Sequence, residues 1–145
     1  MDFEDVVYAA SLVLLCYVVL FVPLNTFLAF NVGVMSGSNI AAFLLAGLIT
    51  GVTFAGKLSD RRTVSIGKIL LIVSTFVVFF ILTSNVVDWT AYRETYATTW
   101  SAGEWAYEMV LMLYKTIALY EVLALSIMFI GIYTGSILRA LKRQQ

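Results

Sequence analysis

Residues 85–116, NVVDWTAYRETYATTWSAGEWAYEMVLMLYKT, lie between two long apolar runs and differ from both in composition. The segment contains all three tryptophans, four of the eight tyrosines and six charged side chains. Tryptophan and tyrosine prefer the boundary between membrane and water, because the ring is half buried there while its N–H or O–H group stays hydrated. The segment therefore predicts a membrane protein with an aromatic-rich connection, residues 87–116, at one membrane surface.

The composition of the whole chain agrees with this class. Hydrophobic residues make up 61% and charged residues 12% of the 145 positions, against about 45–50% and about 25% in soluble domains. Nine basic residues balance nine acidic ones, so the net charge gives no reason to expect nucleic acid as a partner. The sequence has no histidine and a single cysteine, and it shows no catalytic motif. We therefore expect no cofactor and no bound metal, and an enzyme is the least favoured class.

Four apolar runs, residues 6–30, 40–56, 69–87 and 117–138, are candidates for membrane-spanning helices. A helix needs about 20 apolar residues to cross the hydrocarbon core of about 30 Å, so the second run is only just long enough. We expect an all-α integral membrane protein, a four-helix transmembrane bundle that forms a single domain over residues 1–145.

Two basic clusters predict the orientation of this bundle. One is the connection 57–68, and the other consists of Arg139, Lys142 and Arg143 near the C-terminus. Short loops rich in lysine and arginine stay on the cytoplasmic side. We therefore expect a multi-pass protein of the cell membrane with both termini cytoplasmic, and with residues 31–39 and 87–116 on the outer side.

Residues 102–116 show the pattern of an amphipathic helix. Glu104, Glu108 and Lys115 share one face, and an apolar face that includes Trp105 and Met109 lies elsewhere on the helix. Such a segment either lies on the outer membrane surface or continues the fourth helix out of the membrane. The sequence leaves both arrangements open.

Small residues recur at four-residue spacing in two of the runs: Gly47, Gly51 and Ala55 in the second, and Gly131 and Gly135 in the fourth. In lipid, helices associate through close backbone approach and dispersion, because lipid tails are as apolar as the side chains. We predict that these five residues form helix-packing surfaces.

Acidic side chains provide two further candidate sites. Glu121 is the only acidic residue within the four predicted spans, about one turn below the outer boundary, where a carboxylate is less costly than in mid-membrane. It is the possible coupling group if the protein moves ions. Glu104 and Glu108, with Asp88 or Glu94, could hold a hard cation, although a solvated helix face explains them equally well.

Two functional hypotheses follow. In the first, the chain is a non-catalytic structural or accessory subunit of a larger membrane protein complex, and its outer segment docks through Trp89, Trp100 and Trp105, since tryptophan is a common interface anchor. In the second, it is a small oligomeric transporter or channel with its site between protomers. The expected partners are the lipid bilayer and either other integral membrane subunits or further copies of the chain.

Overall fold

The computed structural model of this chain describes residues 1–33, 35–58, 61–96, 101–142 and 144, with the backbone alone described at 81, 82, 84–93, 95, 96, 113 and 116. Nearly all of these residues are helical. In chain order the elements are α1 (Phe3–Phe27), β1 (Asn31–Val32), β2 (Met35–Ser36), α2 (Gly37–Thr53), α3 (Ala55–Leu58), α4 (Arg62–Tyr96), α5 (Ala102–Thr116), the π-helical turn η1 (Ile117–Glu121) and α6 (Val122–Lys142).

Three helical stretches of the described chain are long and apolar enough to cross a membrane: Phe3–Phe27, Arg62–Phe80 and Ala102–Lys142. They correspond to the first, third and fourth predicted spans. The second predicted span corresponds to α2, which has 17 residues and is shorter than the other three. The described chain is thus mostly helical and compatible with an all-α membrane protein, and the crossing of the bilayer by α2 stays a prediction.

Helix α4 extends beyond the predicted span 69–87 at both ends. It has 35 residues, or about 52 Å at about 1.5 Å per residue. Lys68 and Asp88 mark polar boundaries along the helix without ending it, since the sequence between them and beyond lacks proline, the residue that breaks helices most strongly. A helix of this length exceeds the hydrocarbon core by about 20 Å.

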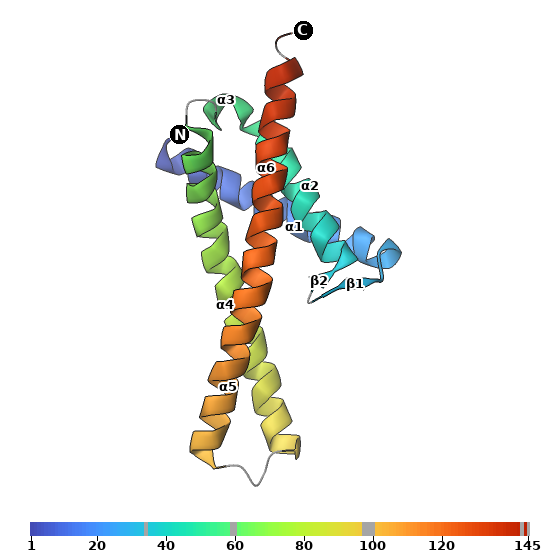
Figure 1. Ribbon diagram of the computed structural model, residues 1–145, viewed down its shortest axis with the longest axis vertical. Helices are drawn as coiled ribbons and strands as arrows, with labels where there is room; N and C mark the ends of the chain where they lie inside the picture. Colours follow the sequence, from blue (N-terminus) through green and yellow to red (C-terminus); the bar gives the residue numbers. More distant parts are fainter. Residues whose placement is uncertain (34, 59–60, 97–100, 143, 145) are drawn as a thin grey trace.

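The returning helical stretch is longer still, with 41 residues. α5, η1 and α6 follow one another without interruption from Ala102 to Lys142, so the amphipathic residues 102–116 continue the fourth helix. Of the two arrangements that the sequence left open, the structure has this one. α4 and α5 contact each other and form a helical hairpin, and Figure 1 shows the last turns of α4 and the first turns of α5 projecting beyond the other elements.

The link between the first two helices has more structure than a turn-rich sequence predicts. Strands β1 and β2 pair antiparallel, with Asn31 opposite Ser36 and Val32 opposite Met35. Gly33 has a φ of 62° at the turn, a conformation that side chains disfavour. Ser36 then caps α2, because its hydroxyl accepts a hydrogen bond from the backbone N–H of Asn39.

Helices α1 and α2 do not run parallel with the long hairpin. Figure 1 shows both crossing α6 obliquely near the end that carries the termini. α2 makes its most extensive contact with α6 and the next with α1. Apolar side chains fill the core between these helices, including Ala9, Val13, Ala46, Met128 and Ile132. The four-helix transmembrane bundle therefore stays a prediction.

The N-terminus lies at the same end of the molecule as the basic connection before α4. Lys57 on α3 forms an ion pair with Asp5 on α1, and the C-terminal end of α6 lies toward the same end (Figure 1). This arrangement agrees with one membrane side for the two termini and that connection. Which side is cytoplasmic rests on the basic clusters alone.

Cysteine labelling tests that orientation. In a Cys16→Ala background, we expect Ser101→Cys to react with an impermeant maleimide in intact cells and Gln144→Cys to react only after permeabilisation, because the basic clusters place the two positions on opposite sides. Both residues are exposed. The Cys16→Ala chain without an added cysteine is the control. Labelling of both positions in intact cells would contradict the orientation.

Candidate functional site

Close contact between α2 and α6 is the tightest packing that the structure describes. A Cβ atom added at Gly51 would lie 2.1 Å from the carbonyl oxygen of Ile132, and one at Gly135 would lie 2.3 Å from that of Leu48. The same holds for Gly47 and Gly131 at 2.8 and 2.5 Å from backbone oxygens. The four glycines predicted to pack are therefore brought together, two from each helix, and each faces backbone of the other.

Ala55, the fifth predicted packing residue, lies on a different element. α2 ends at Thr53, and Ala55 begins the short helix α3. Its side chain is nonetheless buried, and α3 contacts α6. The four-residue spacing with Gly47 and Gly51 therefore does not correspond to one continuous helix face.

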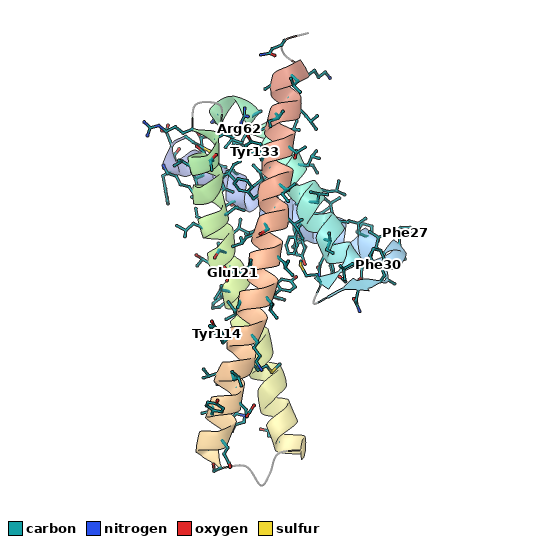
Figure 2. All side chains as sticks on the ribbon, viewed as in Figure 1. Phe27, Phe30, Arg62, Tyr114, Glu121 and Tyr133 are labelled. Carbon is teal, nitrogen blue, oxygen red and sulfur yellow. The ribbon has the colours of Figure 1, made fainter. Side chains whose placement is uncertain are left out.

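Glu121 lies at the end of the π-helical turn and meets α4. The hydroxyl of Ser74 donates a hydrogen bond to its carboxylate oxygen Oε1, and both side chains are half buried. Figure 2 labels Glu121 where the returning helix runs beside α4. A π-helical turn inserts an extra residue into a helix and often marks a functional site. The sequence identified the carboxylate of Glu121 as a candidate, but it predicted neither the hydrogen bond to Ser74 nor the π-helical turn.

Substitutions at this pair separate the role of the hydrogen bond from that of the charge. We expect Glu121→Gln to change the free energy of unfolding by less than about 0.5 kcal/mol, because the amide oxygen can still accept from Ser74. Ser74→Ala removes the donor and should cost about 1–2 kcal/mol. Denaturation in mixed micelles measures both. Equal losses from the two variants would show that the charge itself matters.

A polar and aromatic cluster between α1 and α2, toward the ends that the β1–β2 link joins, was not anticipated. Tyr17 donates a hydrogen bond of 2.7 Å to the side-chain oxygen of Asn39. Its ring stacks on that of Phe43 at a centroid distance of 4.3 Å. Ser38 donates to the side-chain oxygen of Asn25 at 3.2 Å. These contacts join two different helices, between residues 22 and 13 positions apart, and the pattern within a single helix could not identify them.

The structure describes the side chain of only one of the three tryptophans that were predicted to form the outer docking surface. Trp100 lies outside the described residues, and for Trp89 only the backbone on α4 is described. Trp105 is half buried on α5. The most exposed large apolar side chains described on α5 are different ones: Tyr107 at 66%, Val110 at 60% and Tyr114 at 71%. These three follow the spacing i, i+3 and i+7, which places them on one helix face, and we call them the α5 stripe.

Glu104, one of the acidic residues of α5, has a structural use. Ser101 and Glu104 form a reciprocal cap: the Ser101 hydroxyl accepts from the backbone N–H of Glu104 at 3.2 Å, and the Glu104 carboxylate accepts from the backbone N–H of Ser101 at 2.9 Å. This arrangement starts a helix by satisfying two free N–H groups. Within the described part of the chain, no three acidic, histidine or cysteine side chains come close enough to hold a metal ion.

The fold and these contacts define a helical membrane protein with a projecting hairpin. The chain matches no protein-family model, no curated protein and no solved structure. Its function must therefore be argued from its own surfaces.

Proposed function

We propose that this chain is a non-catalytic accessory subunit that binds a larger integral membrane protein through the projecting α4–α5 hairpin. The observation that supports the proposal most is the length of the hairpin. Its two arms come from helical stretches of 35 and 41 residues, where about 20 residues cross a bilayer. The extra turns serve no purpose in anchoring, and they carry an apolar surface away from the membrane.

The α5 stripe supplies the chemistry for such a contact. Tyr107, Val110 and Tyr114 stay exposed although α4 lies beside α5, and Figure 2 labels Tyr114 on the hairpin below the crossing helices. Exposed apolar side chains at i, i+3 and i+7 are the pattern with which one helix enters a groove of its partner. Tyrosine adds a hydroxyl that can hydrogen-bond at the rim of an interface.

Affinity purification tests the proposal. The tagged chain is extracted in a gentle detergent, and co-purifying membrane proteins are quantified by mass spectrometry. We expect one foreign integral membrane protein at near-stoichiometric yield. The triple variant Tyr107→Ala, Val110→Ala, Tyr114→Ala should lower that yield at least about tenfold, since buried aromatic anchors dominate interfaces.

A second triple variant on α1 provides the matched control. Leu15, Val18 and Val22 are exposed at 62%, 61% and 68% and have the same i, i+3, i+7 spacing, but they lie on a membrane-spanning helix. Their replacement by alanine should leave the yield unchanged. Loss of the partner from the α1 variant, with retention in the α5 variant, would contradict docking through the hairpin.

The alternative is a small oligomeric transporter or channel whose site lies between protomers. The contact between Ser74 and Glu121 at the π-helical turn favours it, because a half-buried carboxylate in a membrane helix is a candidate coupling group. This reading expects purification of a homo-oligomer without foreign subunits. It also expects Glu121→Gln to assemble normally and to abolish flux in reconstituted vesicles.

A further inference from the structure

A groove opens between α2 and α6 at the end of the molecule that carries the termini. It has a volume of about 470 Å³, and the described residues that line it are Val52, Leu138, Arg139 and Lys142. The groove exists because the two helices end at different heights. α2 ends at Thr53, whereas α6 continues to Lys142, and Figure 1 shows α6 running on past the end of α2.

The close contact at Gly135 fixes the position along α6 at which this groove begins. A Cβ at Gly135 would lie 3.0 Å from the backbone nitrogen of Val52, so the two helices touch immediately before the groove begins. One turn further along α6, α2 no longer covers its partner. The floor is therefore apolar, formed by Val52 and Leu138, and the rim consists of the two cations that follow Leu138.

Arg139 and Lys142 are available for an anion. They are three residues apart on α6, which places them on the same helix face. Two other basic residues at this end are engaged: Lys57 pairs with Asp5, and the guanidinium of Arg62 lies 5.8 Å from the ring centroid of Tyr133, a pair labelled in Figure 2. Among the described residues, neither Arg139 nor Lys142 has an acidic partner within ion-pair distance.

We propose that this groove binds one anionic phospholipid, with the phosphate held between Arg139 and Lys142 and an acyl chain along Val52 and Leu138. The arrangement of charge and apolar surface identifies the ligand. The side chains of Arg139 and Lys142 can both donate hydrogen bonds to a phosphate group. The apolar floor of a groove on a membrane protein is filled by hydrocarbon rather than by water. Basic pockets between transmembrane helices recognise anionic headgroups in this way. A free phosphate would use the cations but not the apolar floor.

Native mass spectrometry of the purified full-length chain tests the site. Phosphatidylglycerol and phosphatidylcholine with the same acyl chains are added separately, and the ratio of lipid-bound to free protein is measured. We expect selective retention of phosphatidylglycerol. Arg139→Gln and Lys142→Gln should each weaken its binding about fivefold, and both together about 25-fold, if each cation contributes as one charge near an anionic surface.

Two controls identify the location and the ligand. Arg61→Gln with Lys68→Gln removes two exposed cations that do not line the groove, and it should leave binding unchanged. A loss equal to that of the Arg139→Gln, Lys142→Gln variant would mean that lipid responds to basic charge in general, and it would overturn the proposal. Leu138→Trp fills the apolar floor at a residue that is 51% exposed, and it should weaken phosphatidylglycerol binding. Unchanged lipid binding by Leu138→Trp, with binding of inorganic phosphate that depends on both cations, would assign the groove to a free anion instead.

Discussion

Gly51→Ala is expected to lower the free energy of unfolding by about 3 kcal/mol, the upper part of the range for overpacking a well-packed contact. The reason is the distance of 2.1 Å between the added Cβ and the carbonyl oxygen of Ile132. That atom belongs to the backbone of α6 and cannot rotate away, so the two helices must separate. Separation removes the dispersion contacts that hold helices together in lipid. Gly51→Leu should prevent the α2–α6 contact altogether.

Gly67→Ala is the matched control. Gly67 lies within α4, and a Cβ there would meet no atom within 4 Å. The change should not lower stability, and the higher helix propensity of alanine should raise it by about 0.5–1 kcal/mol. Denaturation of the purified proteins in mixed micelles measures both variants. If Gly51→Ala were as stable as Gly67→Ala, the close approach of α2 and α6 would not exist in the folded protein.

Phe43→Ala is expected to cost about 2–3 kcal/mol. Phe43 is 4% exposed and lies between two aromatic rings, stacked on Tyr17 of α1 and edge-on to Tyr120 of η1 at a centroid distance of 6.3 Å. Its loss leaves a cavity where three elements meet. The estimate lies below the 3–5 kcal/mol typical of soluble cores, because unfolded helices in lipid also keep the ring in apolar surroundings.

Phe79→Ala provides the comparison for this prediction. Phe79 is 69% exposed on α4, so its removal creates no cavity, and we expect almost no change in the denaturation midpoint. Thermal denaturation in detergent should separate the two variants clearly. A larger loss from Phe79→Ala would mean that the exposed face of α4, rather than the Tyr17–Phe43–Tyr120 stack, is a packed surface.

The projecting hairpin shows where sequence reasoning fell short. The apolar run 69–87 is visible in the sequence, but the helix that contains it continues to Tyr96. Hydropathy reports where a helix can enter lipid, not where its backbone stops being helical. A helix ends when its terminal groups are capped or a residue breaks it, and Asp88 does neither. The Ser101–Glu104 cap, by contrast, is a local pattern that could have been recognised from the sequence.

At the candidate site, Glu121 likewise has one feature that the sequence reveals and others that only the fold reveals. A lone carboxylate in an apolar run is visible from the sequence, but its Ser74 partner lies 47 residues away on another helix. The π-helical turn that precedes α6 also changes which residues share a face, because it adds a residue to the regular period. The regular α-helical period, counted from Lys115 before the π-helical turn, therefore cannot predict which helix face carries the side chain of Glu121.

The sequence by itself determined that this is a helical membrane protein, since composition and the length of apolar runs are local properties that the bilayer selects directly. It also marked Gly47, Gly51, Gly131 and Gly135 as small residues at helical spacing. Only the tertiary structure decided that these glycines face one another and that Tyr17 donates a hydrogen bond to Asn39. It also decided that α6 continues past the end of α2, which leaves a groove lined by basic residues. The physical reason is that lipid-facing and buried positions are equally apolar in a membrane helix, so the face that packs is chosen by the partner helix rather than by the pattern.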